Sequence, residues 1–190
     1  APQAVEEGAA FSFAIPVSDP EGQTLNYALV GDVPAGATIG AASGVFAWTP
    51  TDGPLTQTVT VRVSDGALAS EASFDIVVLD VPPVIALSGE ATVNVGEAYT
   101  LNFSATDAGT DTVEQWIVSW GDGVTSLLAG STTSATRTYT LGGNFAITVT
   151  AIDEDGSHTS APLAVRALVP NRTPVAASPQ PVSLNEDQPT

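Results

Sequence analysis

Hydrophobic and polar residues alternate with a period of two along most of the chain. The clearest runs are residues 11–17, 59–63, 99–105 and 145–151, in which apolar residues at every second position are separated by small or polar ones. Such a pattern places the apolar side chains on one face of a β-strand. No stretch has convincing helical periodicity, and Gly, Pro and Asp punctuate the short strands. The chain is therefore predicted to be all-β and to form tandem Ig-like β-sandwiches.

The strand pattern occurs twice. Residues 61–84 and residues 149–175 each contain a strand, an Asp-Gly turn, a second strand and a linker with proline. The two Asp-Gly turns lie about 90 residues apart, which is the size of one Ig-like sandwich. We therefore expect one domain at 1–81 and a second at 82–168. Residues 169–190 are expected to hold a linker and the start of a next repeat, or an exchanged strand, because they are too few to fold alone.

Charge and composition exclude several kinds of chemistry. The formal net charge is −17 and the chain has only four cationic side chains, so nucleic acids and anionic membrane surfaces are unsuitable partners. The absence of Cys and Lys and the single His exclude disulfides, thiolate sites, Schiff-base chemistry and a two-histidine zinc site within the chain. No apolar run approaches the ~20 residues that span a bilayer. The chain lacks Met and opens on no signal-peptide pattern, so we expect a processed product or a piece of a longer polypeptide.

Sequence motifs relate the two halves to known families. In the first half, residues 19–22 (DPEG), 44–50 (GVFAWTP) and 63–66 (VSDG) resemble the bacterial putative-Ig and dystroglycan-type cadherin-like repeats. In the second half, residues 116–123 (WIVSWGDG) and 153–156 (DEDG) resemble a PKD repeat. The resemblance implies modules that occur in arrays within secreted and cell-surface proteins, including large adhesins and enzyme accessory regions. It implies no activity of their own.

Acidic residues concentrate in the predicted turns and in the linker. In a sandwich, the loops after the second and sixth strands lie at the same end as the incoming linker. The resemblance to cadherin-like repeats implies Ca²⁺ at such junctions, and Ca²⁺ takes six to eight oxygen ligands. The candidate Ca²⁺ ligands are Asp19, Glu21 and Asp65 in the first domain, Asp80 in the linker, and Asp107, Asp111, Asp153 and Asp155 in the second domain. The alternative is that these residues only form tight turns.

The remaining chemically interesting side chains favour a structural role. Trp116 and Trp120 share one strand face, which fits either a sugar-binding platform or the sandwich core, and the core is favoured. Trp48 has the same interpretation. His158 follows a turn, and a solvated histidine is favoured over a catalytic base. Because every acid maps to a turn or linker, no catalytic residue is predicted and the protein is not expected to be an enzyme.

These observations favour a non-enzymatic extracellular module, secreted or on the surface of a bacterial cell. The tandem sandwiches are expected to form a stalk or adhesive fibre that Ca²⁺ stiffens at the domain junctions. The expected partners are neighbouring repeats or identical subunits, with a surface protein or glycan as a further target. Two alternatives stay open. One is a filament subunit that adds a strand near residues 181–185 to the sheet edge of a neighbour, and the other is an accessory binding module of a secreted hydrolase.

Overall fold

The computed structural model describes residues 2–171, 173 and 174, and this part of the chain is built of β-strands without a helix. The strands of the first half are β1 (Gln3–Glu6), β2 (Phe11–Ala14), β3 (Asn26–Val30), β4 (Thr38–Ile39), β5 (Val45–Trp48), β6 (Leu55–Ser64) and β7 (Ala69–Leu79). Those of the second half are β8 (Val84–Ser88), β9 (Thr92–Asn94), β10 (Ala98–Thr106), β11 (Gln115–Ser119), β12 (Thr125–Ala129), β13 (Ser134–Thr138), β14 (Gly143–Ile152), β15 (Ser157–Thr159) and β16 (Leu163–Leu168). Within the described residues, no helix has the length and apolarity to cross a membrane.

Domain 1 comprises β1 to β7 and is a sandwich of two sheets. One sheet has the strand order β1-β7-β6-β3, and the other has the order β2-β5-β4. β1 runs parallel to the last part of β7, with Glu6 opposite Leu79. This pairing places the residues after β1 beside the end of β7, where the chain leaves the domain. The buried apolar side chains of this domain are Val5, Tyr27, Phe46, Trp48, Val59, Val61, Ile76 and Val78.

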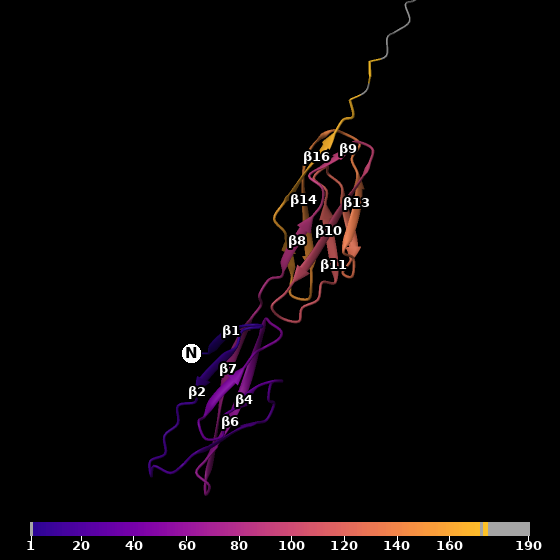
Figure 1. Cartoon of the computed structure of the whole chain (residues 1–190). Helices are drawn as coiled ribbons and strands as arrows, with labels where there is room; N and C mark the ends of the chain where they lie inside the picture. The colour runs from indigo at the N-terminus through magenta and orange to yellow at the C-terminus, as the bar shows by residue number, and fades with distance from the viewer. Residues whose placement is uncertain (1, 172, 175–190) are drawn as a thin grey trace, which may run out of the picture.

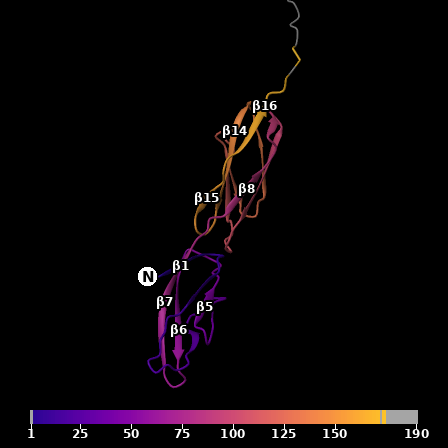
Figure 2. The same ribbon diagram turned by 60° about the vertical axis from the view of Figure 1, so that its left-hand side comes forward.

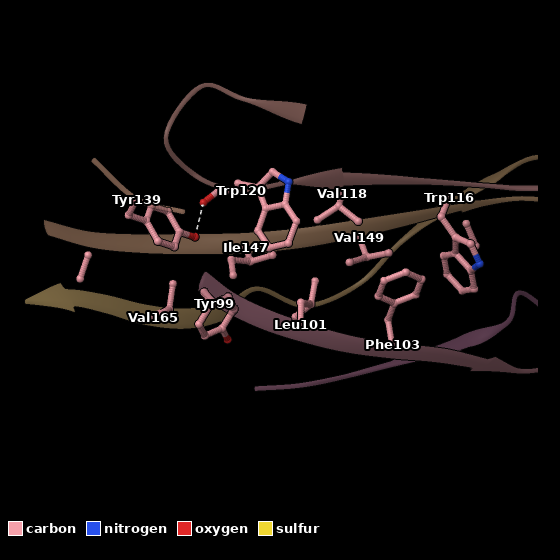
Figure 3. Close-up of a cluster of buried hydrophobic side chains, with 12 residues drawn as sticks. Tyr99, Leu101, Phe103, Trp116, Val118, Trp120, Tyr139, Ile147, Val149 and Val165 are labelled. Carbon is pink, nitrogen blue, oxygen red and sulfur yellow. Dashed lines mark hydrogen bonds between the residues drawn. The ribbon is translucent and has the colours of Figure 1, made fainter. Parts of the chain in front are cut away.

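Domain 2 comprises β8 to β16 and repeats the same plan. Its sheets have the orders β13-β10-β8 and β12-β11-β14-β16-β9, and β15 adds to β14. Figure 3 shows the aromatic rings and aliphatic side chains from both sheets packed between the strands. Trp120 is fully buried, its indole N–H donates to Ser126 Oγ at 2.9 Å, and its carbonyl accepts from the Tyr139 hydroxyl at 3.0 Å. The polar side-chain atoms of Trp120 and Tyr139 are therefore satisfied inside the core, whereas the Tyr99 hydroxyl is buried without a hydrogen-bond partner.

The two domains follow one another end to end, as both Figure 1 and Figure 2 show. β7 ends at Leu79 and β8 begins at Val84, so a short segment connects the sandwiches. The loops after β10 and after β14 of domain 2 face domain 1. The loop after β2 and the turn after β6 lie at the opposite end of domain 1 (Figure 1).

The structure confirms the all-β prediction and the prediction that the tryptophans belong to the cores. Trp116 and Trp120 are 3% and 0% exposed, and Trp48 is 8% exposed. None of these three rings forms a surface platform for sugars. The predicted next repeat or exchanged strand, including residues 181–185, lies outside the described residues and stays a prediction.

Candidate metal centre at the domain junction

Backbone contacts bring the two domains together at one end of each. The Thr51 carbonyl of domain 1 accepts hydrogen bonds from the backbone N–H and the hydroxyl of Thr110 in domain 2, at 2.8 and 3.0 Å. Gly8 has a φ of +69°, and a Cβ at this position would collide with the Ala108 carbonyl oxygen. The loop after β10 is therefore packed directly on domain 1, and only glycine fits at the closest approach.

Glu7 lies between the domains and is 1% exposed. Its backbone N–H donates to the Leu79 carbonyl at 3.0 Å, which continues the pairing of β1 with β7. Its Oε1 accepts from the Val81 N–H at 3.1 Å, whereas its Oε2 is buried without a hydrogen-bond partner. Gly109 of domain 2 lies so close that a Cβ there would be 2.7 Å from the Glu7 carboxyl carbon. A buried carboxylate oxygen without a partner is costly unless a cation or proton compensates it.

Five acidic side chains from both domains and the linker form two overlapping groups. Oxygens of Glu7, Asp80 and Asp111 lie within 4.8 Å of one another, and so do oxygens of Asp52, Asp111 and Asp155. Asp111 belongs to both groups. We call these five residues the junction carboxylates. Asp107 stands beside them and interacts electrostatically with Glu7 and Asp111.

Hydrogen bonding leaves this cluster unsatisfied. One oxygen each of Glu7, Asp80, Asp107 and Asp111 is buried without a hydrogen-bond partner. Among residues 2–171, 173 and 174, contacts within ion-pair distance join only Arg137 with Asp122 and His158 with Asp153. No cationic side chain in the described part of the chain therefore forms an ion pair with a junction carboxylate.

Burial, followed by repulsion between neighbouring acids, raises the pKa values of Glu7, Asp111 and Asp155. Burial raises the pKa of Asp111 to about 7, and repulsion from Glu7 and Asp107 adds to the effect. Burial also raises the pKa of Glu7 above its ordinary value, against the hydrogen bond from Val81. The pKa of Asp155 is raised by burial and then by the neighbouring Asp80. The fully ionised cluster is unfavourable in the absence of a cation.

The donor set fits a hard divalent cation. All candidate ligands are carboxylates, with no imidazole or thiolate among the junction carboxylates, and oxygen donors suit Ca²⁺ rather than Zn²⁺ or Cu²⁺. The ligands come from the turn after β1, the β5–β6 loop, the linker and two loops of domain 2. Mg²⁺ requires a near-ideal octahedron and usually retains several waters, whereas Ca²⁺ accepts irregular arrangements of six to eight oxygens.

The predicted ligands of domain 2 and the linker do gather at the junction. Asp80, Asp111 and Asp155 are junction carboxylates. Asp107 accepts from the Gly109 N–H at 2.7 Å through one oxygen and leaves the other buried and unpaired. Asp153 is 7% exposed and accepts from the backbone N–H groups of the turn that follows it, at 2.9 and 3.2 Å. Its hydrogen bonds are those of a turn-forming residue.

The predicted ligands of domain 1 lie elsewhere. Asp19, Glu21 and Asp65 are in the loop after β2 and the turn after β6, at the end of domain 1 remote from domain 2. Asp19 accepts from the Gln23 N–H, and Asp65 accepts from the N–H groups of Ala67 and Leu68, at 2.7 Å each. These bonds lower the pKa of Asp65. Within the described residues these three acids belong to no cluster of metal-ligand spacing.

Two junction carboxylates, Glu7 and Asp52, were not predicted from the sequence. Glu7 has a detectable signal, because it lies two positions after the buried Val5 and so shares its inward face. Asp52 has no comparable signal, since its loop reaches the junction only through the packing of domain 1. His158 also differs from expectation: its side chain is 18% exposed and its Nε2 lies 3.5 Å from an Asp153 oxygen, so it is not a freely solvated turn residue.

This architecture of two stacked Ig-like sandwiches with an acidic junction defines a tandem-repeat module. Residues 1–79 match the family described as Putative Ig domain, and residues 80–167 match the family described as PKD domain. The chain is thus a putative-Ig domain followed by a PKD domain. Domains of these types are typical of extracellular proteins and are usually non-catalytic, although PKD domains also occur in peptidases.

Solved structures with a similar fold include single PKD domains and paired modules. The PKD domain of an M14-like peptidase from Thermoplasmatales archaeon SCGC AB-540-F20 is 22% identical, with a TM-score of 0.40, over 49% of this chain and 100% of that one. The PKD1 domain of Vibrio cholerae metalloprotease PrtV is 22% identical, with a TM-score of 0.38, over 46% and 98%. Human protocadherin-24 EC1-2 is 12% identical, with a TM-score of 0.41, over 90% and 95%. No curated protein sequence matches the chain.

Proposed function

We propose that this chain is a non-enzymatic segment of an extracellular tandem array, in which Ca²⁺ held by the junction carboxylates stiffens the connection between the two domains. The observation that carries the proposal is the buried carboxylate of Glu7, which has an unpaired oxygen within 4.8 Å of oxygens of Asp80 and Asp111. A buried carboxylate oxygen without a hydrogen-bond partner is costly unless a cation or a proton compensates it, and a bound Ca²⁺ would supply that compensating charge.

The proposed site has two cation positions that share one ligand. Glu7 and Asp80 with Asp111 supply the first position, and Asp52 and Asp155 with Asp111 supply the second. Each position takes ligands from both domains. A cation therefore binds well only when the domains are aligned, and its binding energy stabilises that alignment by mass action. At a tenfold excess of free Ca²⁺ over the dissociation constant, one such position contributes about 1.4 kcal/mol.

An extracellular location suits this mechanism. Extracellular Ca²⁺ modules bind with dissociation constants of roughly 10⁻⁴–10⁻³ M. The two domain types are those of secreted and surface proteins. In the array, each sandwich is a rigid unit, and the junction sets how far adjacent units bend. A stalk or adhesive fibre at a bacterial surface needs such control, and its partners are the neighbouring repeats and a surface protein or glycan at its tip.

Thermal unfolding in Ca²⁺ and in chelator tests the proposal, with a pair of adjacent glutamates as matched variants. Glu7→Gln removes a buried junction carboxylate, whereas Glu6→Gln changes an exposed residue next to it. The melting temperature of the parent and of Glu6→Gln is expected to rise with millimolar Ca²⁺. Glu7→Gln is expected to lose most of this rise. In chelator, Glu7→Gln is expected to melt above the parent, because it removes one of the repelling charges.

Two outcomes would overturn the proposal. One is a parent protein with the same melting temperature in chelator and in millimolar Ca²⁺. The other is a Ca²⁺ response that Glu6→Gln and Glu7→Gln reduce equally, which would assign the response to general screening of the net negative charge.

A further inference from the structure

The end at which the chain leaves each domain has the same arrangement of backbone hydrogen bonds, here called the frame, in both domains. In domain 1, Glu7 N–H donates to the Leu79 carbonyl and Gly8 N–H to the Pro50 carbonyl, at 3.0 and 2.8 Å. In domain 2, the corresponding bonds run from Val95 to Leu168 and from Gly96 to Tyr139, at 2.8 and 3.0 Å. β1 is parallel to β7, and β9 is likewise parallel to β16. The positions that hold the junction carboxylates of domain 1 can therefore be located in domain 2.

The acids of this frame are replaced by aliphatic residues in domain 2. From the paired hydrogen bonds, Val95 stands where Glu7 stands, Leu141 corresponds to Asp52, and Val169 corresponds to Asp80. We call Val95, Leu141 and Val169 the apolar end of domain 2. Leu141 and Val169 are 75% and 72% exposed, and Gly142 lies against the Val169 side chain. This end is marked by the labels β9 and β16 at the top of Figure 1.

In domain 1 the same frame is a docking surface. The Thr51 carbonyl, one residue beyond Pro50, accepts both hydrogen bonds from Thr110 of domain 2. The corresponding residue in domain 2 is Thr140, one residue beyond Tyr139. The equivalent surface of domain 2 thus has the backbone arrangement that contacts a neighbouring domain in domain 1. Its side chains are aliphatic, which suits a hydrophobic contact rather than a cation site.

The amino-acid sequence after domain 2 indicates which kind of domain would contact the apolar end. Residues 184–187 (Leu-Asn-Glu-Asp) follow the pattern of residues 5–8 (Val-Glu-Glu-Gly), which places Glu186 at the position of Glu7. Pro181 likewise stands where Pro2 stands. The amino-acid sequence from about residue 181 therefore follows the pattern that opens domain 1.

We propose that the apolar end of domain 2 docks the next domain of the same polypeptide, of the putative-Ig type, through a hydrophobic contact that needs no metal ion. This inference rests on the tandem array of the proposed function. It adds that the junctions differ in chemistry: a carboxylate junction follows the putative-Ig domain, and an apolar junction follows the PKD domain. Removing Ca²⁺ would then loosen the first kind and leave the second intact, because burial of aliphatic side chains does not depend on a cation.

A chain of three domains tests the proposal. A second copy of residues 2–81 is joined after Gln180, so that Pro2 of the copy replaces Pro181. Since the chain has no cysteine, pairs of introduced cysteines can carry spin labels for distance measurements by pulsed electron paramagnetic resonance. Ala28→Cys in domain 1 with Thr136→Cys reports on the first junction. Thr136→Cys with Ala28→Cys in the added copy reports on the second junction.

The second junction is expected to give a narrow distance distribution that is the same in Ca²⁺ and in chelator. Replacing both exposed residues of the apolar end, by Leu141→Asp with Val169→Asp, is expected to broaden that distribution. Leu127→Asp is the control, because Leu127 is 64% exposed on β12 and lies away from this end. Circular dichroism verifies that each variant keeps the β-fold.

Either of two results would overturn the proposal. The first is a distribution across the second junction that is as broad in the parent as in the double aspartate variant. The second is a distribution that narrows only when Ca²⁺ is added. The first junction, read in the same chain, reports on the Ca²⁺ proposal separately, so the failure of one proposal is distinguishable from the failure of the other.

Discussion

Replacing Trp120 by alanine tests whether the indole directly after β11 holds domain 2 together. The indole is fully buried among the side chains of both sheets (Figure 3). Its removal leaves a cavity, for which Trp→Ala substitutions cost about 3–5 kcal/mol. Ser126 also loses its donor, a bond of 2.9 Å whose net contribution is about 1 kcal/mol. Trp120→Ala should therefore remove a large share of the ~5–15 kcal/mol that stabilises a typical domain.

Urea unfolding followed by far-ultraviolet circular dichroism measures this loss without relying on tryptophan fluorescence. With a slope of about 2 kcal/mol per M, a loss of 4 kcal/mol lowers the midpoint of domain 2 by about 2 M. Trp120→Phe keeps most of the apolar burial and removes only the indole N–H, so its midpoint should fall much less. Leu127→Ala, at a residue that is 64% exposed, should change stability by less than about 0.5 kcal/mol. If Trp120→Ala unfolds at the same urea concentration as Leu127→Ala, the interpretation of this strand as core is wrong.

Four further outcomes are expected. In chelator, lowering the pH from about 8 to about 5 should raise the melting temperature. The reason is that the folded chain binds a proton at Asp111 (pKa about 7) that the unfolded chain, with a pKa of 3.8, does not bind. Asp111→Asn should flatten this trend, and a parent protein that only loses stability on acidification would contradict it. Asp65→Ala should weaken the turn after β6 and leave the Ca²⁺ response unchanged, since Asp65 lies at the end of domain 1 remote from domain 2. A smaller rise in melting temperature on Ca²⁺ titration than in the parent would contradict this prediction. Arg137→Gln should destabilise domain 2 by about 1 kcal/mol in urea, because its bonds of 2.7 and 2.8 Å to Asp122 are partly shielded from water; an unchanged midpoint would mean that solvent screens the pair fully. Purified protein should hydrolyse no polysaccharide, peptide or ester, and turnover abolished by a single substitution in this chain would refute the non-enzymatic function.

The sequence predicts the fold because a period of two is a local signal that the packing of a sandwich preserves. Trp116 and Trp120 are four positions apart, so their side chains point to the same face of the extended chain, and both are buried. The loops that carry Asp111 and Asp155 were correctly placed beside the linker by the order of strands in a sandwich. This placement needs no side-chain detail, since it follows from the direction in which each strand runs.

The composition of the cluster was harder to predict, because it depends on contacts between distant segments. Glu7 directly follows the alternating strand β1, yet its burial depends on the close approach of Gly109 from the other domain. Asp52 is exposed in a loop whose approach to Asp155 follows from the packing of two sandwiches. The pairing of Arg137 with Asp122 likewise joins strand β13 with the turn after β11, which the chain order does not bring together. Asp19 and Asp65 accept the backbone hydrogen bonds of their turns, and a sequence motif alone does not separate such acids from metal ligands.

Solution X-ray scattering of the intact chain, in millimolar Ca²⁺ and in chelator, is the sharpest test of whether Ca²⁺ stiffens the domain junction. The particle is expected to be more extended and less flexible with Ca²⁺, and to become more compact and variable when the chelator removes the ion. Asp155→Ala, which removes a junction carboxylate, should abolish much of this difference, whereas Asp122→Ala, at the opposite end of domain 2, should keep it. Identical scattering in Ca²⁺ and in chelator, or an equal loss of the response in both variants, would contradict the proposal that Ca²⁺ stiffens this junction.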